Sequence, residues 1–427
     1  MRWGIAATMW MGAVLFMSYG CKGGPESGGV QEPTAGGEAP DRAGEGSEAV
    51  ASAEDVSSPW GATRAEQCRR PPRPAISAKA KKPLDEGARA AAQGDTTSAE
   101  TSFEQALKRD PDAYQALYNL GVLADRRGKE KVAIDYYRRA LGLLPDYELA
   151  ARGISTILLR RGQVQEAVAV VEPLANAHRA NLDLQALYAE LLVEARRLEE
   201  AWLAARRALK CDERFVPALI ALVKASRAQG REELADSILE QAMQVDSQVA
   251  ELHYLEGERR KAEPGGLRDA LAAYQRAVQL RPDYAEARMA LGIQLLAGGN
   301  YEDALSHFQA AERLVPTLPE VHVNLGDAYR ATRQWTEAQR AYRRALELRA
   351  ELPEAHYGLG LLFLTAAGDF PGLDELSAYE KAVDELRAYR AQMGPRLSRD
   401  DQSAEYLRDL ERLIERTRRR LEREGGT

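Results

Sequence analysis

The sequence predicts an all-α protein: a right-handed superhelical solenoid of antiparallel helix pairs, preceded by a disordered tether and closed by C-terminal capping helices. Alanine recurs every 34 residues, with one inserted residue before the sixth member, at Ala99, Ala133, Ala167, Ala201, Ala235, Ala270, Ala304 and Ala338. A glycine precedes several of these alanines by twelve residues, as Gly121 precedes Ala133, and a bulky residue such as Tyr137 follows most of them. Self-similarity at this period indicates a stack of helix–turn–helix units.

The residue types agree with such a stack. Small residues mark the places where two antiparallel helices approach closely, and a bulky residue fills the space between neighbouring pairs. Prolines close several units, because proline cannot continue a helix; these are Pro111, Pro145, Pro282 and Pro316. The unit from Tyr114 to Tyr147, YQALYNLGVLADRRGKEKVAIDYYRRALGLLPDY, resembles the tetratricopeptide repeat (TPR) family. The resemblance covers residues 80–366, as about eight full repeats and the start of a ninth.

Residues 1–20 resemble the signal peptide of a bacterial lipoprotein. Arg2 is followed by a stretch without charged residues from Trp3 to Gly20, and Gly20 directly precedes Cys21. An uncharged run behind a cationic start indicates an export signal. The resemblance implies lipidation of Cys21 and, because Lys22 follows, an outer-membrane anchor that faces the periplasm. The alternative is an uncleaved transmembrane anchor, because about 18 residues are just enough to span a bilayer.

Residues 21–79 are expected to form a Gly/Glu/Pro-rich disordered tether that ends in a basic stretch. From Lys22 to Pro59 there is no Leu, Ile, Phe, Met or Tyr, so little apolar surface is available to offset the entropy of ordering. The stretch from Arg64 to Lys82 is basic. It is either a solvated linker or a contact with anionic cell-wall polymer or lipid head groups.

Composition and cysteine content limit the partners and the compartment. A net charge of −7 and a pI of about 5.6 argue against nucleic acid, which usually requires a basic domain. Cys211 falls near the end of a second helix, where we expect it in the apolar core. An exported protein also permits a Cys68–Cys211 disulfide, and the sequence leaves that pairing open.

No residue pattern predicts catalysis, a cofactor or a metal site, so we expect a non-enzymatic protein that binds partners through the inner surface of the solenoid. By the family resemblance, the second, fifth and ninth residues of each unit are the informative positions. The fifth residues include apolar or aromatic candidates, namely Tyr118, Tyr254, Met289 and Tyr357. The second residues form an acidic rim, namely Glu251, Glu286, Glu320 and Glu354. Such a surface suits a protein segment with basic flanks, and inter-repeat packing is the alternative role of the tyrosines.

The pattern weakens in the middle of the array and again after it. Pro173 falls inside a predicted second helix and is expected to kink or interrupt it. Residues 367–427 are expected to hold the divergent end of the ninth repeat and two helices, roughly Glu375–Gln392 and Ser398–Arg423. The last helix has one apolar and one arginine-rich face. It serves either to cap the solenoid or to dock a partner.

The lipoprotein signal, tether, TPR array and the tail AYRAQMGPRLSRDDQ together resemble the TPR lipoproteins of the adventurous gliding-motility machinery of diderm bacteria. The resemblance implies a non-enzymatic, outer-membrane-linked subunit of a trans-envelope complex. Two alternatives are a TPR lipoprotein that assists type IV pilus secretin assembly and one that assists outer-membrane protein assembly. An alternative of another class is an accessory arm of a cell-wall enzyme complex.

Overall fold

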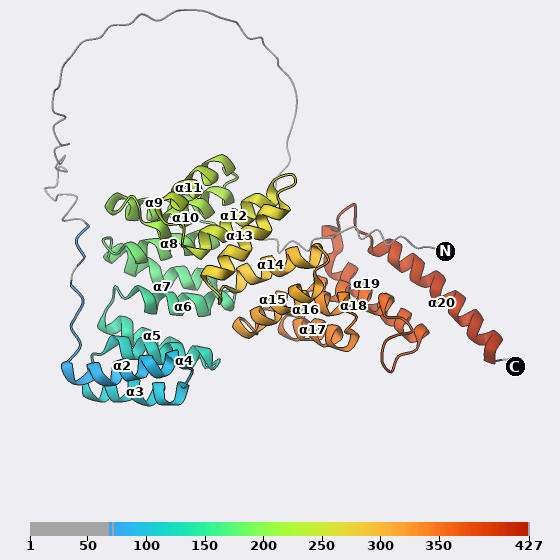
Figure 1. Ribbon diagram of the computed structural model, residues 1–427, viewed down its shortest axis with the longest axis horizontal. Helices are drawn as coiled ribbons and strands as arrows, with labels where there is room; N and C mark the ends of the chain where they lie inside the picture. Colours follow the sequence, from blue (N-terminus) through green and yellow to red (C-terminus); the bar gives the residue numbers. More distant parts are fainter. Residues whose placement is uncertain (1–67, 71, 426–427) are drawn as a thin grey trace, which may run out of the picture. The chain divides into compact units, whose positions relative to one another are not determined.

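The computed structural model describes residues 68–70 and 72–425 (Figure 1). The predicted signal peptide, the predicted lipidation site Cys21 and the tether up to residue 67 lie outside the described residues. Within the described part, the chain folds into helices joined by short turns and contains no strand, so the predicted all-α solenoid is confirmed. None of these helices is both long and apolar enough to cross a membrane.

The described chain divides into two compact units between Gly230 and Arg231. The first, which we call the N-terminal unit, contains four helix pairs and one further helix. Their bounds are α2 Ala78–Ala92, α3 Thr96–Arg109, α4 Tyr114–Arg126, α5 Glu130–Leu143, α6 Glu148–Arg160, α7 Val164–Ala177, α8 Leu182–Glu194, α9 Leu198–Cys211 and α10 Val216–Ala228. The first helices α4, α6 and α8 begin 34 residues apart, as in the sequence period.

The second unit, the C-terminal unit, continues the same alternation. Its helices are α11 Glu232–Val245, α12 Ala250–Ala262, α13 Leu267–Leu280, α14 Ala285–Ala297, α15 Tyr301–Leu314, α16 Pro319–Ala331, α17 Trp335–Leu348, α18 Pro353–Thr365, α19 Glu375–Met393 and α20 Ser403–Gly425. A short 3₁₀ turn, Gly394–Arg396, follows α19.

The glycines of the period make room for the bulky residues. Tyr342 of α17 has no exposed surface, and a Cβ atom on Gly326 of α16 would lie 2.4 Å from its ring. On the other side of the ring, a Cβ atom on Gly358 of α18 would lie 2.3 Å away. Gly121, Tyr137 and Gly153 repeat this arrangement in the N-terminal unit. Each such ring is therefore enclosed between two first helices at positions without a side chain.

The small residues at the helix crossings should not tolerate enlargement. Ala133 and Ala304 are fully buried, so we expect Ala133→Leu or Ala304→Leu to lower the free energy of unfolding by about 1–3 kcal/mol through overpacking. Urea denaturation followed by circular dichroism measures the change. Lys131→Leu, which adds leucine to an exposed position of the same helix as Ala133, is the control. If both alanine variants unfolded at the same urea concentration as the wild type, the predicted register of the repeats would be wrong.

Pro173 does not interrupt its helix, so the expected interruption is wrong. Helix α7 runs from Val164 to Ala177 with Pro173 inside it. Val168 and Val171 on the same helix are buried, and this packing holds the helix although proline removes one backbone hydrogen bond.

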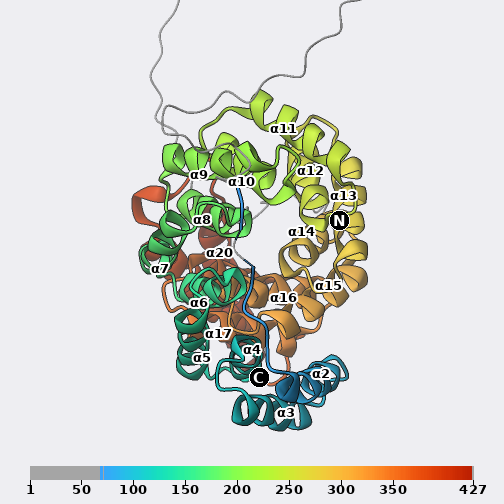
Figure 2. The same cartoon turned by 90° about the vertical axis from the view of Figure 1, so that its left-hand side faces the viewer.

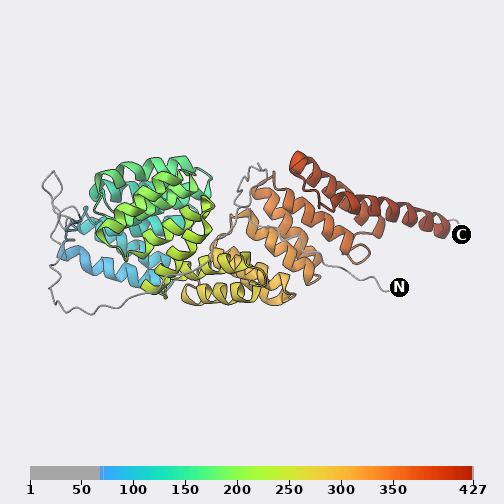
Figure 3. The same ribbon diagram turned by 90° about the horizontal axis from the view of Figure 1, so that it is seen from above.

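The C-terminal helices cover an apolar surface of the array. Helix α20 packs along α19 (Figure 3). Leu410 of α20 is fully buried, in one cluster with Leu359 and Phe363 of α18. Of the predicted apolar face, Leu421 is 46% exposed, because the last turns of the helix extend past this cluster. Helix α20 begins at Ser403, five residues later than the predicted Ser398.

Candidate functional site

The predicted anchors lie in first helices, and the tyrosines among them contact rings of their own helix pair or of the turn that closes it. Tyr118 of α4 is half-buried, and its ring centroid lies 5.8 Å from that of Tyr137 and 5.5 Å from that of Tyr147. Tyr254 of α12 has equivalent contacts, at 6.0 Å to Tyr274 and 5.5 Å to Tyr284. These rings therefore pack within their own repeat while keeping part of their surface accessible.

The two remaining anchors differ from each other. The Tyr357 ring of α18 is half-buried and lies 5.0 Å from that of Tyr389 in α19. Met289 of α14 is only 8% exposed and belongs to the core cluster of Tyr274 and Phe308. Met289 therefore packs in the core beneath the inner face, whereas part of the Tyr357 side chain is accessible to a partner. Their roles in partner binding remain predictions.

The predicted acidic rim lies entirely in the C-terminal unit. Glu286 of α14 and Glu354 of α18 are exposed, whereas Glu251 of α12 and Glu320 of α16 are half-buried. Glu320 accepts a hydrogen bond from the Arg349 guanidinium. Burial, with the charges of Glu251 and Glu286, raises the pKa of Tyr284. Glu286 and Glu354 are thus the rim carboxylates with the most exposed surface.

Carboxylates at the ninth position of two units have a structural role. The Tyr342 hydroxyl donates to Asp327 Oδ1 at 2.7 Å, and the Tyr274 hydroxyl donates to Glu258. Both rings are fully buried, so these carboxylates accept the hydrogen bonds that the hydroxyls would otherwise donate to water.

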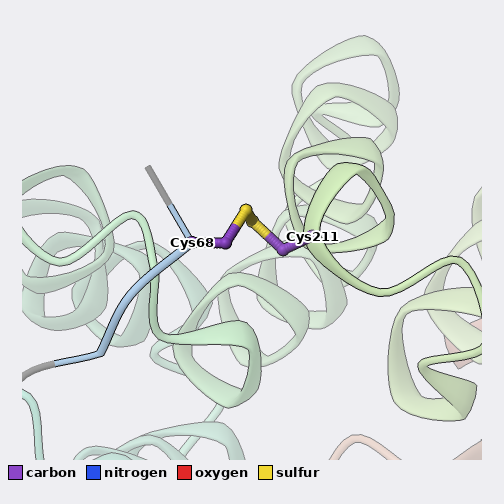
Figure 4. The surroundings of a disulfide bond; sticks show 2 residues. All are labelled: Cys68 and Cys211. Carbon is purple, nitrogen blue, oxygen red and sulfur yellow. A yellow bond between two sulfur atoms is a disulfide. The ribbon is translucent and has the colours of Figure 1, made fainter. Parts of the chain in front are cut away.

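A second site, of which the sequence analysis considered only the Cys68–Cys211 pairing, involves residues 68–70 and 72–77, which we call the strap. Cys68 forms a disulfide with Cys211 at the end of α9, with the two Cα atoms 5.4 Å apart (Figure 4). Cys211 is half-buried and bonded to Cys68, so the expectation that it packs in the apolar core is wrong. Because α2 begins at Ala78, the last part of the predicted tether belongs to the fold.

Two arginines of the strap bind carboxylates of the N-terminal unit. Arg70 contacts three of them: its Nη2 lies 2.8 Å from Glu148 Oε2, its Nε lies 3.3 Å from Asp146 Oδ2, and its Nη1 lies 3.7 Å from Asp183 Oδ2. Arg73 donates to Glu148 Oε1 at 2.7 Å. These cations of the basic stretch are therefore paired within the protein.

We call Asp110, Asp146, Glu148 and Asp183 the acidic row. Asp110 Oδ2 accepts the strap's Ser77 N–H at 2.7 Å. Burial alone would raise the pKa of Glu148, but its own backbone, Arg73 and Arg70 donate hydrogen bonds that hold this pKa below its ordinary value. Glu148 is thus a carboxylate that requires cationic partners.

The sequence carried only a weak signal for this row. Acidic residues recur in the turns before first helices, as Asp112 and Asp146 do 34 residues apart. Such residues also suit turns in general, so their recurrence does not by itself indicate a binding site.

Within the described residues, no group of three or more His, Cys, Asp or Glu side chains is placed to hold a metal ion. The arrangement instead provides helix faces, half-buried aromatic rings and carboxylates, which suit the binding of a polypeptide.

Sequence models of the tetratricopeptide repeat match residues 84–148 and 262–319, and a TPR repeat model matches residues 326–365. Both units therefore carry tetratricopeptide repeats, a helix-pair fold that serves as a scaffold for protein–protein interaction. A comparison with curated protein sequences gave no significant match.

A comparison with solved structures gave matches that include the following three. The APC/C hetero-tetramer Cut9-Hcn1 matches at 17% identity and a TM-score of 0.46, over 80% of this chain and 78% of that one. The P58(IPK) TPR domain matches at 17% identity and a TM-score of 0.26, over 80% and 99%. YrrB, described as a TPR protein with an unusual peptide-binding site, matches at 22% identity and a TM-score of 0.32, over 43% and 95%.

Proposed function

We propose that the protein is a non-enzymatic scaffold of the bacterial envelope, lipid-anchored through Cys21 in the outer membrane and facing the periplasm. The observation that carries the proposal is the Cys68–Cys211 disulfide in a TPR solenoid, because disulfides persist in oxidising compartments outside the cytosol. The lipoprotein-like signal at residues 1–20 supports the same compartment.

Within the envelope, we propose that it acts as a subunit of a trans-envelope gliding-motility complex. The support is the tail that resembles this family, which forms the end of α19 and the connection to α20. There the Tyr389 hydroxyl donates to Asp401 Oδ2 at 2.6 Å, and Arg390 Nη1 donates to Ser403 Oγ at 2.7 Å. Family-like residues thus form a defined element of the C-terminal unit.

Affinity purification of the tagged full chain from crosslinked envelopes, followed by mass spectrometry, tests the proposal. We expect recovery of other motility subunits, and strongly reduced recovery with Cys21→Ser, because the unlipidated chain leaves the membrane. Labelling with a fatty-acid analogue checks the anchor independently. Equal labelling of Cys21→Ser and wild type would contradict lipidation. Recovery of a secretin, of the outer-membrane assembly barrel or of a cell-wall enzyme would favour the corresponding alternative.

The same purification locates the binding surface. Glu286→Lys with Glu354→Lys reverses the two most exposed rim charges, and we expect loss of a basic partner with unchanged helicity. The matched control is Glu232→Lys with Glu302→Lys, which reverses two exposed charges on second helices. Full retention of every partner by the rim variant would exclude the acidic rim.

A further inference from the structure

We propose that the acidic row is a binding site for an extended protein segment that carries two arginines three positions apart. In this structure the chain's own strap fills that site, and the Cys68–Cys211 disulfide holds it there. The inference uses the proposed function only in taking the partner to be a protein.

The path of the strap matches the repeat. Ser77 lies at the turn before α4, Arg73 lies at the start of α6, and Cys68 lies at the end of α9. Between these contacts Arg70 bridges the starts of α6 and α8. Figure 2 shows the strap, drawn in blue, passing α8, α6 and α4 on its way to α2.

Nine residue steps separate Cys68 from Ser77 and pass three repeats. An extended chain rises about 3.3 Å per residue, so the segment advances about 10 Å for each repeat that it passes. This length is close to the distance of about 8–10 Å between the axes of packed helices. An extended segment can therefore place one contact on each successive repeat.

The carboxylates of the acidic row are placed to bind cationic side chains. The Asp146 side chain is only 7% exposed, and Asn181 Nδ2 also donates to its backbone oxygen at 2.7 Å. Removal of the strap would take Arg70 from Asp146 and both arginines from Glu148, and a buried carboxylate without its cation is costly. A vacated row would therefore favour another arginine-bearing segment over water.

Aromatic and apolar groups complete the site. The Arg73 guanidinium lies 5.6 Å from the centre of the Tyr147 ring, a cation–π contact that favours arginine. Ile76 packs on the cluster of Ala99 and Phe103. The sequence of residues 68–77, CRRPPRPAIS, contains three prolines, which favour extended conformations of the unbound segment and lower the entropy cost of binding.

The disulfide decides whether the strap can be displaced. While Cys68 and Cys211 are bonded, the strap stays beside the row at a high effective concentration. A dithiol reductant opens the bond: its thiolate attacks one sulfur, and its second thiol resolves the mixed disulfide. Two electrons and two protons pass to the cysteine sulfurs, and the dithiol becomes a disulfide. The strap then stays joined to the fold only through α2, its contacts with the row are non-covalent, and a partner segment can compete.

The test measures fluorescence anisotropy of a labelled peptide of residues 66–78 carrying Cys68→Ser, added to the detergent-solubilised full chain. We expect no binding to the oxidised wild type. A released variant, Cys68→Ser with Arg70→Glu and Arg73→Glu, should bind the peptide at least tenfold more tightly than the oxidised wild type does. Its affinity for the peptide should fall as the salt concentration rises. Adding Glu148→Lys and Asp183→Lys to the released variant should abolish binding.

Two controls keep the outcome unambiguous. A peptide with Arg70→Glu and Arg73→Glu should not bind any form, and the wild type treated with dithiothreitol should gain binding without any substitution in the solenoid. Equal binding by the oxidised and released chains would overturn the proposal, as would retained binding by the row variant. These measurements use only the purified chain and the peptide. Their outcome therefore does not depend on whether the envelope purification recovers the proposed partners.

Discussion

Loss of the Cys68–Cys211 disulfide should destabilise the N-terminal unit more than any single surface change. Cys68→Ser with Cys211→Ser opens a covalent loop with a sequence separation of 143 residues. By the loop-entropy relation, such a crosslink stabilises the folded state by about 5 kcal/mol. Urea denaturation under non-reducing conditions measures the change. We expect the urea midpoint of the N-terminal unit to fall. Each repeat of a solenoid contacts only its neighbours, so the loss of stability should stay within this unit.

The C-terminal unit supplies the internal reference for this measurement, because the disulfide lies wholly within the N-terminal unit. Either single cysteine variant should reproduce the double variant, since each removes the same bond. An unchanged midpoint would show that the crosslink does not restrain the unfolded chain. Equal shifts of both transitions would show that the effect is not local to repeats inside the loop.

The helical array could be predicted from sequence because its packing rule repeats. Gly326 and Gly358 enclose Tyr342, and the same spacing recurs at Gly121, Tyr137 and Gly153. Each recurrence strengthens the same inference, so local packing and chain topology follow from one pattern. The helices α19 and α20 follow from amphipathic spacing, although the start of α20 was placed five residues early.

The strap could not be predicted in this way, because its contacts occur once. Cys68 pairs with a residue 143 positions away, and Arg70 with acidic residues more than 70 positions away. The composition of the preceding tether indicates disorder, and nothing in its spacing indicates that residues 68–77 rejoin the fold. A basic stretch also has many possible anionic partners, including those of the protein itself.

The inner-face tyrosines mark a different limit. The repeat pattern predicted Tyr118 and Tyr254 on first helices, where each contacts two rings of its own repeat. A tyrosine combines a large apolar ring with a polar hydroxyl, so the same side chain suits inter-repeat packing and partner binding. Sequence position alone does not separate these roles.

Tyr342→Ala should be the most damaging single change in the C-terminal unit. The ring is fully buried between Gly326 and Gly358, which have no side chains to fill a cavity. Truncation of a buried aromatic residue costs about 3–5 kcal/mol. The change also removes the hydroxyl that donates to Asp327, a carboxylate shared with Arg330 at 3.4 Å.

Two further variants separate the ring from the hydroxyl. Burial and the nearby Asp327 charge hold the pKa of Tyr342 above its ordinary value, so its hydroxyl stays protonated and donates at neutral pH. Tyr342→Phe keeps the ring and loses only this bond, so we expect a cost of about 1–3 kcal/mol for the lost hydrogen bond to a charged acceptor. Tyr301→Ala, at a 39% exposed tyrosine of α15, should leave the urea midpoint nearly unchanged. If the alanine and phenylalanine variants of Tyr342 lost equal stability, the hydrogen bond to Asp327 would outweigh ring packing, contrary to the enclosure by the two glycines.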